Sequence, residues 1–281
     1  MNIRNVMVVG AGTMGRGIAQ VLAHHGYKVI LSDSDPAALE RALDAIDRSL
    51  GRLAEAGKIE MGDREAALVR LQTSPDLRTA ATAEVVVEAV PEDFAIKSGV
   101  LRALDAEASA GTIFATNTSS LSITRLASAT KRPEKVIGMH FMNPVPLMPL
   151  VEVIRGHATS DQTAKTVMEL ARALGKTPIE SKDAPGFIAN RVLMPMINEA
   201  AWALFEGVAS AEDIDQVMKL GMNHPMGPLA LADFIGLDVC LAILGVLHAE
   251  LGDKYRPCPL LRRMVDAGWL GRKTGRGFFT Y

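Results

Sequence analysis

Residues 5–33 read NVMVVGAGTMGRGIAQVLAHHGYKVILSD and have the pattern of one strand–helix–strand unit. Residues 6–9 form a continuous apolar run of strand length, which is typical of a strand covered on both faces. Ile18, Val21 and Leu22 then recur at helical spacing, and residues 29–31 predict a second strand that leads to Asp33. The unit indicates an α/β fold with a mostly parallel sheet.

The turn between the first strand and the helix carries the pattern G-x-G-x-x-G. Gly10 allows the tight turn, Gly12 lets a pyrophosphate approach the backbone, and Gly15 lets the helix pack closely on the strand. The helix N-terminus adds N–H groups and the positive end of a dipole. The motif alone is a weak indication, but here a strand precedes it, a helix follows it, and an acid ends the next strand. We therefore predict a Rossmann-type doubly wound domain that binds a dinucleotide through Asp33 and the turn residues Gly10, Ala11, Gly12, Thr13, Met14 and Gly15.

Asp33 also predicts which dinucleotide is bound. It lies 18 residues beyond Gly15, where an acid can accept hydrogen bonds from both ribose hydroxyls. The 2′-phosphate of NADP would meet this carboxylate, and the next charged residue is a second acid, Asp35, rather than an arginine. Arg16 and Arg41 are the nearest basic residues in the sequence. NAD is the predicted cofactor, and NADP is the less favoured one.

Three later apolar runs, EVVVEAV, GTIFATNTSS and KVIGMHF, predict further strands that end at Glu88, near Asn117 and at His140. Ligands of open α/β sheets bind beyond the carboxyl ends of the strands. The polar side chains expected to converge there are Glu92, Lys97, Asn117, Ser119 and His140. The hydroxyl groups of Ser119, Ser120 and Ser122 are equally compatible with capping of a helix.

Asp35 and Pro36 open a long amphipathic helix, with the acid as its N-cap. Its polar face carries Arg41, Asp44, Arg48, Arg52 and Glu55. A face of this kind is usually only solvated. The alternative is that its basic residues, together with Lys58, attract an acidic substrate.

The character of the chain changes near residue 184. Later segments are helical in period or composition, so we predict a dinucleotide-binding domain over residues 1–184 and a smaller all-α domain over residues 185–281. One of its helices is apolar almost all round, with Val192, Leu193, Met196, Ile197, Trp202, Leu204 and Phe205. Fewer than 100 residues can hardly cover such a helix, so we predict a subunit interface in a homodimer.

Composition excludes several other classes of protein. The 281 residues are 48% hydrophobic and 22% charged with a net charge of −2, which gives no electrostatic basis for binding nucleic acid. Because no apolar run reaches roughly 18 residues and no signal peptide is visible, we expect a cytoplasmic protein with no membrane span. Cys240 and Cys258 have no metal-binding spacing, and we predict no metal site.

The chain resembles the 3-hydroxyacyl-CoA dehydrogenase family, and most closely its short-chain bacterial 3-hydroxybutyryl-CoA branch. The resemblance covers essentially the whole chain and rests on six ordered motifs: GAGTMGRGIAQ, NTSSLSIT, KVIGMHFMNPVPLMPLVEVI, DAPGFIANRVL, NHPMGPLALADFIGLD and GWLGRKTGRGFFTY. It implies an NAD(P)-dependent oxidoreductase of fatty-acid and butanoate metabolism. This enzyme would interconvert a 3-hydroxyacyl-CoA, 3-hydroxybutanoyl-CoA, and the 3-oxoacyl-CoA, acetoacetyl-CoA.

The resemblance implies that His140 is the catalytic base and Glu152 its partner. Both lie in the otherwise apolar run GMHFMNPVPLMPLVEVI, where a polar group without a partner would be costly. Oxidation of a secondary alcohol needs a base that takes the hydroxyl proton while hydride leaves the same carbon. A carboxylate on the other ring nitrogen would fix the tautomer and stabilise the imidazolium. Together these arguments favour a catalytic pair over a structural histidine.

Further roles are implied by the same resemblance. Ser119 matches the serine that contacts both the nicotinamide cofactor and the substrate hydroxyl, and Asn190 matches the asparagine that helps to hold the acyl portion. The implied cofactor contacts are Asp33, Glu92, Lys97 and Asn143. Ser49 matches a coenzyme A contact. The lysine expected beyond it is Ala56 here, and Lys58 is the predicted substitute.

Three other functions are compatible with parts of this pattern. A related oxidoreductase acting on a free β-hydroxy acid would normally use a lysine base, whereas this chain has His140 at that point. An NAD-binding sensor without catalysis would not need the His140–Glu152 pair. A structural protein that had recruited the fold could keep every motif, so the sequence does not distinguish it from the enzyme.

Overall fold

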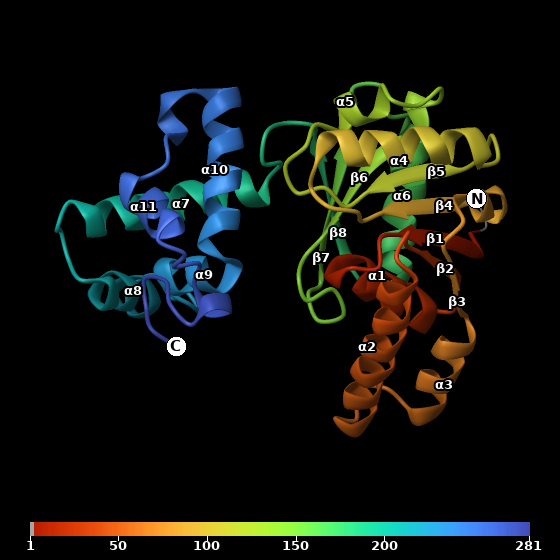
Figure 1. Cartoon of the computed structure of the whole chain (residues 1–281), viewed down its shortest axis with the longest axis horizontal. Coiled ribbons are helices and arrows are strands. Elements are labelled where there is room, and N and C mark those ends of the chain that lie inside the picture. The colour runs from red at the N-terminus through yellow and green to blue at the C-terminus, as the bar shows by residue number, and fades with distance from the viewer. Residues whose placement is uncertain (1–2) are drawn as a thin grey trace. The chain divides into compact units, whose positions relative to one another are not determined.

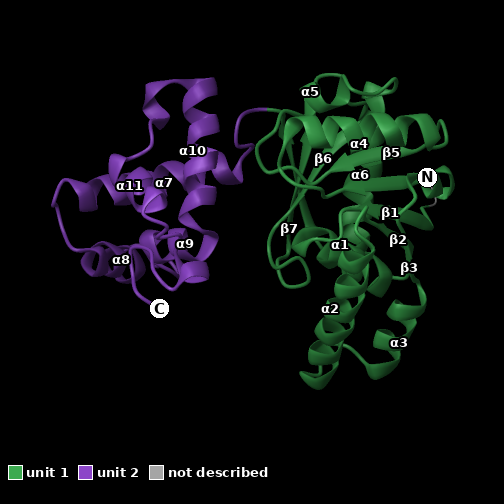
Figure 2. Cartoon of the chain, in the orientation of Figure 1, with its two compact units in different colours: residues 1–183 green, residues 184–281 purple. Residues whose placement is uncertain are grey.

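The computed structural model describes residues 3–281. The chain divides into two compact units, unit 1 from Met1 to Asp183 and unit 2 from Ala184 to Tyr281, which have different colours in Figure 2. This division lies one residue before the boundary expected from the composition.

Between residues 3 and 281 the chain forms eight β-strands and eleven α-helices (Figure 1). The strands, all in unit 1, are β1 (Asn5–Val9), β2 (Lys28–Ser32), β3 (Leu71–Ser74), β4 (Val85–Glu88), β5 (Ile113–Thr116), β6 (Val136–Phe141), β7 (Leu150–Arg155) and β8 (Thr177–Lys182). The helices of unit 1 are α1 (Thr13–His24), α2 (Pro36–Glu55), α3 (Met61–Val69), α4 (Phe94–Glu107), α5 (Ile123–Ala127) and α6 (Asp161–Ala173). Unit 2 contains α7 (Ala189–Phe205), α8 (Ala211–Leu220), α9 (Pro228–Ile235), α10 (Leu237–Leu251) and α11 (Pro259–Asp266).

The strands form one sheet in the order β3-β2-β1-β4-β5-β6-β7-β8. Every neighbouring pair is parallel except β6 and β7, which are antiparallel. The order of the first six strands is that of a dinucleotide-binding Rossmann sheet, and the order reverses between β1 and β4. The predicted fold class is therefore confirmed.

Both faces of the sheet are covered, as the unbroken apolar run of β1 predicts. Val6 and Val8 belong to one core cluster with residues of α1, α2 and α6. Met7, whose side chain points to the opposite face, is fully buried as well. Helices α2 and α3 also pack against each other and against α1 (Figure 1). The sheet of unit 1 is therefore buried on both faces.

Unit 2 has a separate core built from helices α7–α11. Its terminal segment is held by the buried Asp233 of α9, whose carboxylate accepts hydrogen bonds from the N–H groups of Phe278 and Phe279, both at 2.9 Å. Within residues 3–281, no single helix is long and apolar enough to cross a membrane. Helices α9 and α10 pass that test of length and composition only as a pair bent by 99°.

Candidate active site

The glycine turn has the geometry that its spacing predicts. Gly10 has a positive φ of +103°, and a Cβ there would lie 2.5 Å from the Ala89 carbonyl oxygen. A Cβ on Gly15 would lie 1.7 Å from the Gly10 carbonyl oxygen, so only glycine lets α1 start so close to β1. A Cβ on Gly12 would meet nothing within 4 Å. The space in front of Gly12 is where a ligand can approach the backbone.

A cavity of about 840 Å³ lies over this turn, and its lining includes Asp33. The N-cap of α1 is Gly12, which has no side chain to accept hydrogen bonds from the first-turn N–H groups. These groups and the helix dipole suit a pyrophosphate. The Asp33 carboxylate accepts hydrogen bonds from the N–H groups of Ala11 (2.8 Å) and Asp35 (3.0 Å), which fix it at the end of β2. The residues of this cavity therefore fit a dinucleotide.

His140 and Glu152 are direct cross-strand neighbours on β6 and β7. The Nδ1 atom of His140 lies 2.8 Å from Oε2 of Glu152, and the two side chains are only 11% and 2% exposed. Because an ionised carboxylate only accepts hydrogen bonds, Nδ1 carries the proton and Nε2 is the basic ring nitrogen. The pair has the arrangement of a histidine base with its orienting carboxylate.

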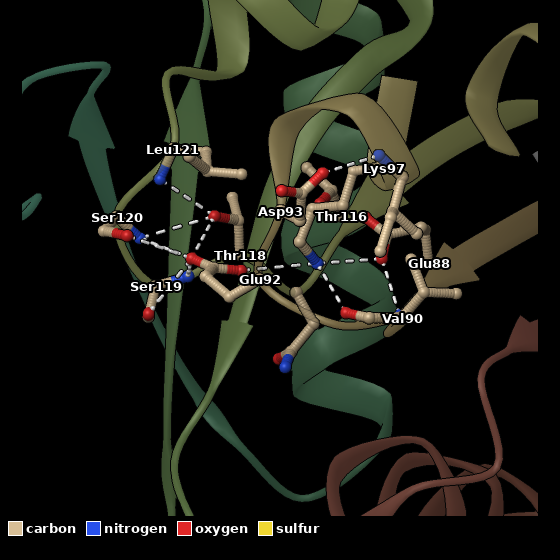
Figure 3. A network of polar contacts seen from close by, with 12 residues as sticks. Glu88, Val90, Glu92, Asp93, Lys97, Thr116, Thr118, Ser119, Ser120 and Leu121 are labelled. Atoms are coloured by element: carbon tan, nitrogen blue, oxygen red, sulfur yellow. Dashed lines mark hydrogen bonds and ion pairs between the residues drawn. The ribbon is translucent and has the colours of Figure 1, made fainter. Parts of the chain in front are cut away.

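Glu92 holds the turn that contains Ser119. Figure 3 shows its carboxylate surrounded by donors from residues 118–120. Oxygen Oε1 accepts hydrogen bonds from the N–H groups of Ser119 (2.8 Å) and Ser120 (3.0 Å) and from the hydroxyl groups of Thr118 (2.6 Å), Ser119 (3.2 Å) and Ser120 (3.1 Å). Helix α5 is capped by Ser122 instead, whose hydroxyl accepts from the N–H of Arg125. Capping thus explains Ser122 but not Ser119.

Lys97 connects this carboxylate to a second one. Its side chain is 1% exposed, and Nζ lies 2.8 Å from Glu88 Oε1, 3.0 Å from the Val90 carbonyl oxygen and 3.4 Å from Glu92 Oε2. Burial alone raises the pKa of Glu92, but the charge of Lys97 and the hydrogen bonds from Thr118 and its neighbours outweigh burial and lower that pKa. The contact between Lys97 and the cofactor, which the resemblance implies, stays a prediction.

The two asparagines expected near His140 have different positions. Asn117 links the ends of β5 and β6, because its Oδ1 accepts a hydrogen bond from the N–H of Phe141 at 2.9 Å. Asn143 is exposed in the loop between β6 and β7. This loop is held by Lys176, whose Nζ donates to the carbonyl oxygens of Val145 (2.6 Å) and Met148 (2.8 Å). Lys176 was not predicted, because nothing in its local sequence indicates burial.

A second cavity, of about 330 Å³, shares Thr13 and Arg16 with the first and continues to the loop after β6. Its lining includes Ser49 and Asn143, as well as the guanidinium-bearing residues Arg16, Arg48 and Arg52, and it includes no carboxylate. Lys58 is exposed beyond the end of α2 and does not line this cavity. The structure therefore brings Ser49 together with the arginines rather than with Lys58.

Asn190 belongs to unit 2, where it is buried in the first turn of α7.

Within residues 3–281, no group of three or more His, Cys, Asp or Glu side chains is arranged to hold a metal ion.

Comparison with known proteins gives a match over both units. The protein-family model described as "3-hydroxyacyl-CoA dehydrogenase, NAD binding domain" matches residues 5–184. The family model for the C-terminal domain of the same family matches residues 186–281. The first of these descriptions confirms NAD as the cofactor.

Individual relatives match over their full lengths. A probable 3-hydroxybutyryl-CoA dehydrogenase of Bacillus subtilis (strain 168) is 56% identical over 100% of this chain and 98% of the relative. A 3-hydroxybutyryl-CoA dehydrogenase of Clostridioides difficile is 50% identical over 98% of each chain. The crystal structure of (S)-3-hydroxybutyryl-CoA dehydrogenase from Ralstonia eutropha superposes with a TM-score of 0.97 at 50% identity, over 100% of this chain and 99% of that one.

Proposed function

Because this chain belongs to the 3-hydroxyacyl-CoA dehydrogenase family, we propose that it interconverts 3-hydroxybutanoyl-CoA and acetoacetyl-CoA with NAD as the hydride carrier. The observation that carries this proposal is the buried His140–Glu152 pair at the carboxyl end of β6. The names of the relatives support the short acyl chain.

His140 supplies the proton chemistry of the reaction. In the oxidative direction, Nε2 takes the hydroxyl proton of the substrate, and in the reductive direction it returns that proton to the carbonyl oxygen. Glu152 keeps Nδ1 protonated and lies opposite the positive charge that develops on the ring. NAD, when bound, accepts or returns the hydride. Ser119 and Asn190 are proposed to orient the substrate, and neither needs to transfer a proton.

The proposed contacts with the pyrophosphate and the adenosine ribose follow the first cavity. The turn from Gly10 to Gly15 would hold the pyrophosphate, and Asp33 would accept hydrogen bonds from the adenosine ribose. Glu92, Ser119 and Asn143 lie outside the lining of this cavity, and they are proposed to contact the nicotinamide end of the cofactor. Lys97 is proposed to contribute there mainly through Glu92, because its ammonium already has three protein oxygens around it.

The coenzyme A portion is proposed to follow the second cavity. Ser49 lies in its lining together with Arg16, Arg48 and Arg52. Guanidinium groups bind phosphate oxygens in a two-pronged geometry, and no carboxylate in this lining competes for them. The family has a lysine at the position that Ala56 occupies here. The three arginines are better placed than Lys58 to take over the phosphate contact of that lysine.

A homodimer is proposed from the surface of unit 2. Large apolar side chains that are 40% or more exposed are frequent there, and they include Val192, Phe205, Val208, Val217, Leu220, Met222, Phe234 and Val239. Apolar surface of this extent is typical of an interaction site. The cytoplasmic location expected from the sequence stays a prediction.

A steady-state assay with acetoacetyl-CoA and NADH tests the proposed activity. The expected result is a higher kcat/KM for acetoacetyl-CoA than for free acetoacetate or for acyl chains longer than four carbons. A higher value for free acetoacetate would favour the dehydrogenase of free β-hydroxy acids. Absence of turnover with every acyl-CoA, despite NADH binding, would favour the sensor.

A further inference from the structure

Two carboxylates and one ammonium lie in a row behind the Ser119 turn (Figure 3). Glu88 is fully buried at the end of β4, Lys97 is buried on α4, and Glu92 lies between the ammonium and the turn. Among these three side chains, it is Glu92 whose carboxylate accepts hydrogen bonds from residues 118–120. Glu88 is thus one step removed from the turn, and the reaction proposed above gives it no role.

Every polar atom of Glu88 and Lys97 is engaged with the protein. Glu88 Oε1 accepts from the N–H of Val90 (2.7 Å) and from Lys97 (2.8 Å), and Oε2 accepts from the hydroxyl of Thr116 (2.6 Å). An ammonium has three N–H groups, and Lys97 has three oxygen partners, in Glu88, Val90 and Glu92. The position of the ammonium is therefore determined from all sides.

This fixed cation determines how Glu92 is oriented. Oxygen Oε2 faces Lys97 at 3.4 Å, which leaves Oε1 aimed at the donors of the turn. A carboxylate this close to a second buried acid would be destabilised in its ionised form without the cation between them. Neutral Glu92 would be a weaker acceptor for the Ser119 and Ser120 N–H groups.

We propose that Lys97 and Glu88 are positioning residues for Ser119: Lys97 keeps Glu92 aimed at the turn, and Glu88 keeps Lys97 in place. The effect on catalysis rests on the function proposed for Ser119 above. A buried ion pair adds little net stability compared with apolar residues of similar size, so a geometric role accounts better for its presence.

The test combines Lys97→Met, Glu88→Gln and the double variant. Lys97→Met leaves Glu88 buried without a cation, so its Tm should fall. The double variant removes both buried charges, and its Tm should recover toward the wild-type value. In Lys97→Met and in the double variant, Glu92 has lost the ammonium group that it faces. Hydrogen exchange of a peptide spanning residues 117–121 should therefore be faster than in the wild type even when Tm has recovered.

Kinetics of the same variants give the second readout. In Lys97→Met and in the double variant, kcat should fall by about tenfold to a hundredfold, because a displaced Ser119 would orient the substrate less accurately. The KM for NADH should change much less. Asp105→Asn is the matched control, because Asp105 is another buried carboxylate on α4 and pairs with Arg132 at 2.7 Å. It should lower Tm without faster exchange at residues 117–121.

Two outcomes would overturn the proposal. If exchange protection and kcat recovered together with Tm in the double variant, the Glu88–Lys97 pair would be structural only. If KM for NADH rose by the factor by which kcat fell, Lys97 would act on the cofactor directly. The exchange measurement needs no substrate, so it decides the positioning role even if the wild-type enzyme proved inactive on acetoacetyl-CoA.

Discussion

The contact between His140 and Glu152 determines which ring nitrogen can exchange a proton with substrate. Since Nδ1 donates to the carboxylate, only Nε2 can act as base. When Nε2 is protonated, the positive charge lies next to a carboxylate whose side chain is 2% exposed, where water screens the attraction poorly. The two residues therefore have separable tasks, proton transfer for His140 and orientation for Glu152.

Replacement of the base should leave a folded enzyme that binds NADH. We expect His140→Gln to lose turnover by about 10²–10⁴-fold, the usual contribution of a positioned base. Steady-state assays and a fluorescence titration with NADH measure the two properties separately. His157→Gln, at an exposed histidine of unit 1, is the control and should retain activity. Turnover of His140→Gln within a few-fold of wild type would disprove the assignment.

Replacement of the partner should affect turnover far more than cofactor affinity. Glu152→Gln keeps an oxygen that can accept from Nδ1 but removes the charge that stabilises the imidazolium. Glu180→Gln, on the neighbouring strand β8, removes an exposed carboxylate and should change neither property. If NADH affinity fell by the same factor as turnover in Glu152→Gln, the role of Glu152 would be structural.

Cofactor preference should depend on Asp33. NADH should give a higher kcat/KM than NADPH. Asp33→Ala should bring the two kcat/KM values closer together, chiefly by weakening the binding of NADH. Arg41 is held by Asp35 at 3.1 Å, so Asp35→Ser is a useful comparison. Serine keeps a side chain that can cap α2, and the substitution releases Arg41. The kcat/KM for NADPH should therefore rise, with little change in the kcat/KM for NADH. An unchanged ratio in Asp33→Ala would mean that another residue discriminates.

At the scale of secondary-structure elements, local patterns predicted the most. The β1–α1–β2 unit follows from glycine spacing and apolar runs, because its contacts lie within about thirty residues. The antiparallel direction of β7 and the burial of Lys97 were not predicted. Strand direction depends on a partner, and the burial of a lysine depends on which face of α4 packs on the sheet. The apolar run indicated that His140 and Glu152 need partners, and the family resemblance implied that they pair with each other. Their cross-strand register on β6 and β7 could be read only from the structure.

Helix α2 should bind the coenzyme A portion through its arginines. We expect Arg48→Ala and Arg52→Ala each to raise KM for acetoacetyl-CoA by about tenfold, corresponding to one charge-assisted hydrogen bond of roughly 1.5 kcal/mol. The kcat should stay unchanged, because the phosphates lie away from the reacting carbon. Lys58→Ala is the matched control, since Lys58 does not line the cavity. A rise in KM with Lys58→Ala alone would restore the assignment made from the sequence.

At the scale of the whole molecule, the change from strand-like to helical composition predicted a boundary after residue 184, and the two compact units of the structure meet between Asp183 and Ala184. Composition could also indicate that unit 2 carries more apolar surface than its own core needs. It could not identify which side chains remain exposed. That depends on how α7–α11 pack, and in the structure Ile197 is fully buried while Val192 is 69% exposed.

The surface of unit 2 predicts that the protein is a dimer in solution. Val217 and Leu220 on α8 are 61% and 82% exposed, and a charge at such positions would be costly in a closed interface. Sedimentation at micromolar concentration should therefore show a species of twice 30.1 kDa for the wild type, and a monomer for the double variant Val217→Glu with Leu220→Glu. Val69→Glu makes the same change at an 84% exposed valine of unit 1 and should remain dimeric. A wild-type species of 30.1 kDa would contradict the dimer, and a dimeric double variant would place the interface elsewhere than α8.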